Sequence, residues 1–182
     1  MLPAMPHDER ERFLAAPRIG VLGVTDPRGG DRAPLVVPVW YGYEPGGEIV
    51  VQTGREMIKA QLLRGAGRFS LCVQDDRRPY RYVSVEGPVT AIEDPVDPAV
   101  REALAQRYLD PEEARDYLVA TADQLKDDIA FRMRPQRWRT ADFAVFAADF
   151  ADAAASAEAD TGANTRADAG AEATSNAGAD AG

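Results

Sequence analysis

The sequence of 182 residues contains one histidine, His7, and one cysteine, Cys72. One residue of each kind cannot form an intrachain disulfide, a Cys-x-x-Cys zinc knuckle or a metal site with two histidines. A Ser-His-Asp triad would have to use His7, which lies in a polar N-terminal stretch where a solvated surface histidine is the simpler interpretation. The sequence therefore predicts no metal centre and no histidine-based nucleophilic catalysis.

Long apolar runs and an excess of basic residues are also missing. No stretch approaches the roughly 20 consecutive apolar residues that cross a bilayer, and residues 1–12 are acidic and polar where a signal peptide is basic and then apolar. The 21 Lys and Arg residues are outnumbered by 30 Asp and Glu residues, which gives a net charge of -9. Nucleic-acid binding needs a concentrated excess of basic residues. We therefore expect a cytoplasmic protein that binds neither nucleic acid nor membranes.

The composition changes abruptly after residue 150. Residues 151–182 comprise 14 Ala, four Gly, six acidic residues and one basic residue, Arg166, with no Leu, Ile, Val, Met or aromatic residue. A segment of this composition cannot bury enough apolar surface to offset its loss of conformational entropy. The sequence predicts one folded domain over residues 1–150, followed by a disordered tail rich in Ala, Gly and acidic residues over residues 151–182.

Alternating apolar residues and turn residues predict that strands make up much of the folded domain. Six strands are expected, over residues 18–25, 34–44, 48–53, 69–74, 80–93 and 128–134. Helical spacing of apolar residues predicts helices over residues 56–64, 98–108 and 111–122, besides a short one that carries Phe13 and Leu14. Antiparallel hairpins interrupted by helices indicate a small β-barrel with peripheral helices, because closing a sheet removes its exposed edges.

The junction between the third strand and the next helix concentrates polar groups. The hydroxyl of Thr53, the guanidinium of Arg55, the ammonium of Lys59 and the free N–H groups of a helix start fall within one and a half turns. Such groups bind the phosphate of an ester. The alternative is an ordinary capped helix with solvated Arg55 and Lys59, and no Walker glycine pattern is present.

Three further features are candidates for ligand binding, and each has a simpler alternative. Pro38 interrupts the hydrogen bonding of the second strand, which either frees backbone groups for a flat ligand or marks an edge strand. The fifth strand has a polar face that a ligand, a partner chain or water would satisfy, formed by Arg81, Tyr82, Ser84 and Glu86. Trp138 lies among four arginines that either face an anionic ligand or balance surface acids.

Together these segments resemble the flavin and deazaflavin split-barrel family, which includes pyridoxamine 5'-phosphate oxidase and the actinobacterial F420-dependent oxidoreductases. The resemblance covers residues 11–143 and is carried by residues 34–41, 53–60, 82–89 and 132–138. It implies a mainly β (β + α) fold, namely a six-stranded antiparallel split β-barrel with peripheral helices. It also implies a homodimer with two cofactor sites in the interface.

The resemblance assigns roles to particular residues. Four residues of the second strand would line the ring of the cofactor, namely Val37, Pro38, Val39 and Trp40. Thr53, Arg55 and Lys59 would hold its phosphate, with Tyr82 as a further contact and Trp138 either reached from the other subunit or part of the core. Met57 departs from the pattern, because many relatives have a phosphate-binding serine there, and this weakens the assignment of FMN.

The expected cofactor is coenzyme F420 or FMN. The frequent use of Ala, Arg, Asp and Gly is typical of high-GC organisms such as actinobacteria, and this association favours F420. The resemblance implies an oxidoreductase that transfers hydride to a small unsaturated or quinone-like molecule. No catalytic residue is assigned, because Tyr41, Tyr82 and water are equally plausible proton donors. The alternative function is a non-catalytic carrier of flavin, deazaflavin or haem.

Overall fold

The computed structural model of the chain describes residues 4–29, 31–144 and 146. The elements in chain order are α1 (His7–Ala15), β1 (Gly20–Val24), β2 (Leu35–Val39), β3 (Tyr41–Gly42), β4 (Ile49–Gly54), α2 (Ile58–Ala66), β5 (Arg68–Asp75), β6 (Arg81–Glu93), α3 (Pro98–Tyr108), α4 (Pro111–Ala120), α5 (Ala122–Leu125), β7 (Asp128–Met133) and β8 (Arg137–Asp142). All of them belong to the unit Met1–Asp142. The predicted domain boundary at residue 150 and the predicted tail lie outside the described residues.

The strands form an antiparallel sheet in the order β2-β1-β5-β6-β7-β4-β3, and β8 pairs with β6. The first and last strands of this order, β2 and β3, are consecutive parts of one extended segment separated only by Trp40. The segment pairs with β1 before Trp40 and with β4 after it, so the sheet curls back on itself. This confirms the expected split barrel with peripheral helices, a mainly β (β + α) fold.

The expected number of six strands is wrong, because the described residues contain eight. The single strand predicted over residues 34–44 is divided at Trp40, where the chain leaves one partner strand and joins another. The additional strand β8 follows Pro135 and pairs with the first half of β6. Its first residues include the exposed Arg137 and Arg139, and only Ala141 is buried, so the strand lacks the apolar alternation on which the prediction relied.

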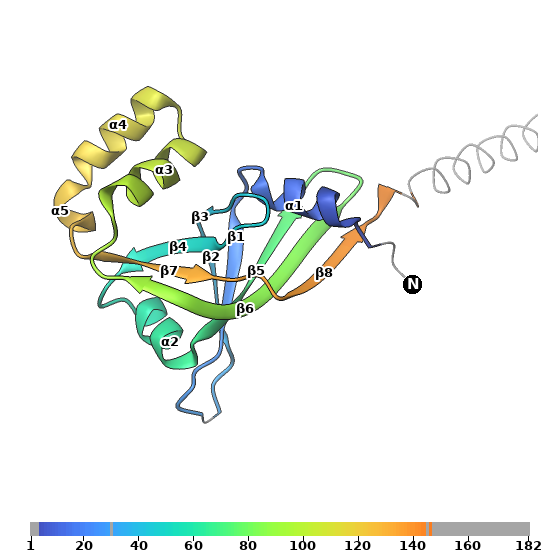
Figure 1. The fold of residues 1–182 in the computed structure, drawn as a ribbon, viewed down its shortest axis with the longest axis horizontal. Coiled ribbons are helices and arrows are strands. Elements are labelled where there is room, and N and C mark those ends of the chain that lie inside the picture. Colours follow the sequence, from blue (N-terminus) through green and yellow to red (C-terminus); the bar gives the residue numbers. More distant parts are fainter. Residues whose placement is uncertain (1–3, 30, 145, 147–182) are drawn as a thin grey trace, which may run out of the picture. The chain divides into compact units, whose positions relative to one another are not determined.

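β6 is the longest strand and belongs to both halves of the barrel (Figure 1). Its first part pairs with β5 and β8, and its last part pairs with β7. The crossing requires Gly87, where a Cβ atom would lie 1.9 Å from the carbonyl oxygen of Arg134. The backbone of the β7–β8 connection therefore lies directly against β6 at this position.

The core fills the inside of the curled sheet with one continuous cluster of apolar side chains. Alternate residues of each strand point into it, so Val83 and Val85 of β6 are fully buried whereas Tyr82 and Ser84 are half-buried. This confirms the predicted polar face for Tyr82, Ser84 and Glu86, whereas Arg81 is wrongly included, because its position in the strand places it on the same face as Val83 and Val85. Phe13 and Leu14 of α1 extend the core.

Sequence signals account for the ends of several helices. Asp97 and Asp110 accept hydrogen bonds from the first turns of α3 and α4, and each precedes a proline at the first helical position. Gly67 ends α2 in the left-handed conformation, with φ of 61°. Figure 1 shows α2 below and α3 and α4 above the layer of β4, β7 and β6. Within the described part of the chain, no helix is both long and apolar enough to traverse a bilayer.

Candidate functional site

Two strand edges that lack a neighbour meet at one point of the barrel. The pairing of β3 with β4 ends at Tyr41 and Val51. Beyond that pair, β2 continues with β1 as its partner, and the rest of β4 continues with β7 as its partner. The facing edges of β2 and of the end of β4 therefore diverge from one place, which is the split of the barrel. Every residue that the resemblance assigned to the ring or the phosphate, apart from Tyr82 and Trp138, lies on these two edges or directly after them.

The end of β4 and the start of α2 form a site suited to an anion. Thr53 is buried near the end of β4, and its side chain makes no hydrogen bond to any described residue. The nine-residue helix α2 has Met57 as its N-cap, with no side chain that caps its first N–H groups. Uncapped N–H groups and the helix dipole attract an anion at this end. Lys59, in the first turn, is half-buried beside them.

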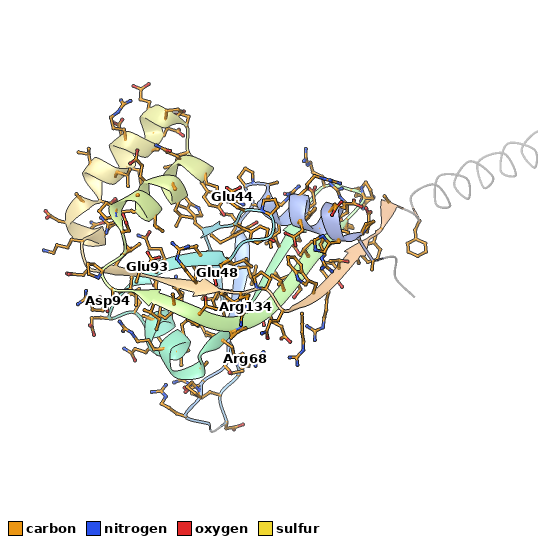
Figure 2. All side chains as sticks on the ribbon, in the orientation of Figure 1. Glu44, Glu48, Arg68, Glu93, Asp94 and Arg134 are labelled. Atoms are coloured by element: carbon orange, nitrogen blue, oxygen red, sulfur yellow. The ribbon has the colours of Figure 1, made fainter. Side chains whose placement is uncertain are left out.

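Arg55 has a carboxylate partner that the sequence analysis did not identify. Its Nη2 lies 2.5 Å from Oδ1 of Asp94, whose Oδ2 lies 2.8 Å from Nη2 of Arg64. Asp94 directly follows β6, and Figure 2 shows it at the end of that strand nearest to α2. One carboxylate thus binds two guanidinium groups, one before and one near the end of α2. Arg55 is held by the protein rather than solvated.

A second carboxylate, Asp128, acts on Lys59. Asp128 begins β7, is buried, and accepts a hydrogen bond of 2.8 Å from the Gln52 amide. Burial lowers the pKa of Lys59 below its usual value, and the negative charge of Asp128 opposes this shift. Lys59 therefore has a negative neighbour that favours its charged form.

The residues assigned to the ring lie along β2 with different exposures. Val36 and Pro38 point to the outside, Val37 is half-buried and Val39 is buried. Pro38 lies on a strand with a free edge, so the edge-strand explanation and the ligand explanation of this proline both remain open. Trp40 is stacked on Tyr108 of α3, with ring centroids 4.9 Å apart and planes 9° apart.

Tyr82 and Trp138 lie away from the junction of β4 and α2. Tyr82 pairs with Gln74 of β5 and Ala141 of β8, in the half of the sheet that includes β1 and β2. Trp138 packs against the core of its own chain, with its ring 6.4 Å from that of Tyr43 and the Arg10 guanidinium 4.6 Å away. Within one chain, Trp138 is therefore a core-associated residue.

Three of the four arginines near Trp138 lie close to two glutamates. Arg132 pairs with Glu93, and both Arg137 and Arg139 lie within 4.0 Å of Glu86. Tyr41, one of the conceivable proton donors, is fully buried and donates a hydrogen bond of 2.7 Å to the Leu14 carbonyl. Burial raises its pKa to about 12, so Tyr41 serves the core and not proton transfer.

Two cavities lie elsewhere on the molecule. One, of about 350 Å³, lies between the β3–β4 hairpin and α3 and is lined by Tyr43, Val50 and Leu104 among others. The other, of about 570 Å³, is bordered by Ile19, by Val21 of β1 and by the end of β5. Neither is lined by any of the nine predicted site residues. The candidate site comprises the edge of β2, the end of β4 and the start of α2.

The sequence analysis missed three residues that shape this region, namely Asp94, Asp128 and Tyr108. Asp94 and Asp128 are separated from the junction by 35 residues or more in sequence, and only strand pairing brings them to it. Gly54 of β4 pairs with Asp128 of β7, and this register places Asp128 at the junction of β4 and α2. The sequence alone does not specify that register. A polar residue at the start or end of a predicted strand is the only signal in the sequence for such a role.

The observed features define a split-barrel protein with an uncapped helix start beside its open edge. The chain belongs to the pyridoxamine 5'-phosphate oxidase family, whose model matches residues 6–140. No curated protein sequence matches the chain.

Solved structures with the same fold include proteins of several kinds. A conserved hypothetical protein from Mycobacterium tuberculosis is 28% identical with a TM-score of 0.60, and the match covers 77% of this chain and 86% of that one. An F420 reductase is 24% identical with a TM-score of 0.55, over 71% of this chain and 94% of its own. A haem-binding protein from Mycobacterium smegmatis is 19% identical with a TM-score of 0.52, over 77% and 55%. The last two support the fold alone.

The residues present fit a cofactor that carries a phosphate. The uncapped N–H groups of α2, the free hydroxyl of Thr53 and the half-buried ammonium of Lys59 are donors for phosphate oxygens. Met57 contributes no such donor, and its side chain is 56% exposed. The binding groups are thus mainly backbone N–H groups and cations. The family binds flavins, and this donor set agrees with that property.

Proposed function

We propose that this protein is an oxidoreductase that uses coenzyme F420 or FMN to transfer hydride to a small unsaturated or quinone-like molecule. The observation that carries the proposal is the uncapped start of α2, with Thr53 and Lys59 beside it, at the open edge of the barrel. Membership of the family supports a flavin-like cofactor. The F420 reductase of the same fold is a precedent for the deazaflavin.

The chain's own residues would bind and orient the cofactor and exclude water. Thr53, Lys59 and the first N–H groups of α2 would hold the phosphate, and Arg55 would border it. Val37 and Val39 would support one side of the ring from the edge of β2. Bound there, the cofactor supplies a carbon or nitrogen centre that accepts or donates hydride. The apolar β2 edge would shield this centre from water.

We propose further that the working form is a homodimer. The outer face of β1 and β2 exposes apolar side chains that one chain leaves uncovered, with Val36 of β2 62% exposed and Val21 of β1 37% exposed. Two neighbouring strands with exposed apolar residues are unusual for a monomer surface. A second copy would cover this face, and Tyr82 and Trp138 would reach the cofactor from that copy.

A non-catalytic carrier is the second candidate, because Tyr41, one of the conceivable proton donors, lies in the core. Tyr41 is committed to the core by its hydrogen bond to Leu14. A haem carrier with histidine ligation would have to use His7, which lies in α1 with 67% of its side chain exposed. Turnover separates the two candidates, since an enzyme reoxidises bound reduced cofactor when a quinone is added and a carrier does not.

The experiment that tests the phosphate assignment is equilibrium binding of FMN and of F420, followed by fluorescence quenching, for the native protein and Lys59→Ala. We expect the variant to lose about 1.5 to 3 kcal/mol of cofactor binding, the usual contribution of a hydrogen bond to a charged group. The matched control is Lys126→Ala, the only other lysine, which is exposed after α5. Equal affinities of both variants, with intact folds, would contradict the assignment.

A further inference from the structure

We propose that Asp94 makes the α2 site selective for a singly charged phosphodiester over a doubly charged phosphomonoester. The inference rests on the proposed function, since it concerns the same phosphate site. It assigns a specificity-determining role to a residue outside the set that would contact the cofactor.

The geometry of Asp94 is that of a bridging anion. Its two carboxylate oxygens bind different guanidinium groups, Oδ1 that of Arg55 at 2.5 Å and Oδ2 that of Arg64 at 2.8 Å. All three side chains are about one third exposed, so the pairs are only partly screened by water. The carboxylate occupies Nη2 of Arg55, whereas Nε of Arg55 is buried and has no hydrogen-bond partner among the described residues. A ligand at α2 therefore meets a guanidinium whose charge is partly balanced by a carboxylate that it shares with Arg64.

Lys59 has a negative neighbour on the other side, although no carboxylate of the described residues lies within 4.0 Å of its ammonium. The buried Asp128 carboxylate is held by the Gln52 amide and acts electrostatically on the ammonium. The site thus contains three cations and two carboxylates, which leaves one net positive charge. The exposed Glu56 and Asp127 add negative charge at its rim.

The groups nearest the helix start leave one net positive charge, and the acidic rim lowers this charge further, so the site suits a phosphate of low charge. The helix start adds a partial positive charge of about one half. A phosphomonoester carries a charge of about -1.5 to -2 at neutral pH, whereas a diester has a single ionised oxygen and carries -1. The second charge of a monoester would be repelled by Asp94, whereas a diester has no second charge. Met57 offers no additional donor to compensate.

The two candidate cofactors differ in this group. FMN ends in a phosphomonoester, whereas the phosphate of F420 links two parts of the side chain as a phosphodiester. The charge balance at α2 therefore favours F420, for a physical reason that is independent of amino-acid usage. Riboflavin, which lacks the phosphate, provides the reference for what the FMN phosphate contributes.

The test is Asp94→Asn, with Kd values for FMN, riboflavin and F420 measured by fluorescence quenching. Removing the carboxylate charge should strengthen FMN binding about tenfold, the effect of one like charge at a partly exposed site, and should change riboflavin and F420 binding less than about threefold. Asp116→Asn, an exposed aspartate of α4, is the matched control and should change none of them.

A second variant guards against a structural effect of the first. Arg64→Gln keeps the carboxylate but removes one of its two partners, so it should weaken FMN binding relative to F420, opposite in sign to Asp94→Asn. An unchanged ratio of FMN to F420 affinity in both variants would overturn the role of Asp94 and leave the proposed function standing. If the native protein binds neither cofactor, both proposals fail.

Discussion

β2 and β3 are two parts of one extended segment, and they differ in burial and in how many of their hydrogen-bonding groups have partners within the chain. In β3, Tyr41 is fully buried, and its backbone N–H donates to the Tyr108 hydroxyl at 3.1 Å while its own hydroxyl donates to the Leu14 carbonyl. In β2, Val36 is largely exposed, and Pro38 has no N–H to donate. Only Trp40 separates the two parts.

This difference distinguishes the groups that the fold needs from those that a ligand or a partner would need. At the closed end, helices α1 and α3 supply partners for the polar groups of Tyr41, and Arg107 donates to the Leu14 and Ala16 carbonyls. At the open end, β2 and the end of β4 each have one neighbour in the sheet. Side chains close the barrel at the end of β3. This closure holds the edges of β2 and β4 in place at the other end and leaves them open to a ligand.

The largest effect is expected from Gly87→Ala, which acts where β6 crosses between the halves of the barrel. An added Cβ would lie 1.9 Å from the Arg134 carbonyl oxygen and 2.9 Å from Sδ of Met133. Backbone must move to relieve this contact, at a cost of about 3 kcal/mol or more. The measurement is urea unfolding.

Gly23→Ala is the control for this substitution, because it is also a strand glycine and its added Cβ would come no closer than 3.9 Å to Ser70. We expect stability close to that of the native chain for this variant. Similar stability of the Gly87 and Gly23 variants would show that the crossing tolerates displacement and that the closed half is less rigid than its packing indicates.

The next largest effect is expected from Tyr108→Phe, which removes one hydroxyl from the closed end. That hydroxyl accepts from the Tyr41 N–H and donates to the Arg18 carbonyl at 2.9 Å. Its loss leaves the Tyr41 N–H without a partner in a half-buried site, so we expect about 1 to 3 kcal/mol lower stability. Tyr117→Phe is the control, because the Tyr117 ring contacts Trp40 but its hydroxyl bonds no described residue.

A thermal melt of both tyrosine variants measures this effect. Equal melting temperatures would indicate that water replaces the lost hydroxyl of Tyr108 and that the closed end is not sealed by this residue. The stack of Trp40 on Tyr108 remains in the phenylalanine variant, so the experiment isolates the hydrogen bonds from the ring contact.

The sequence predicted the elements that local patterns determine. Alternation in residues 80–93 and 128–134 gave the bounds of β6 and β7 to within one residue, and the prolines gave the starts of α3 and α4. It did not predict the division of residues 34–44, because both parts have the same β-branched and aromatic composition. What divides them is the identity of the partner strand, which depends on residues far away in the chain.

The sequence likewise predicted only the part of the candidate site that depends on residues close together in the chain. Thr53, Arg55 and Lys59 lie close together because they are close in sequence, and the structure brings the edge of β2 toward the same split. The carboxylates that balance the two cations come from the end of β6 and the start of β7. Their role depends on strand register, which no local pattern specifies.

The smallest effect on folding, and the sharpest test of the open end, is expected from Val36→Glu. Because Val36 is 62% exposed in one chain, a charge there should change the stability of the monomer by less than about 0.5 kcal/mol. In the proposed homodimer the same charge would be buried in an apolar interface, so light scattering should show a monomer with weakened cofactor binding. Val119→Glu on α4, where Val119 is 74% exposed, is the control and should leave the assembly unchanged. A dimer that persists in Val36→Glu would place the partner on another face, and the open edge of β2 would then have to be completed by the ligand alone.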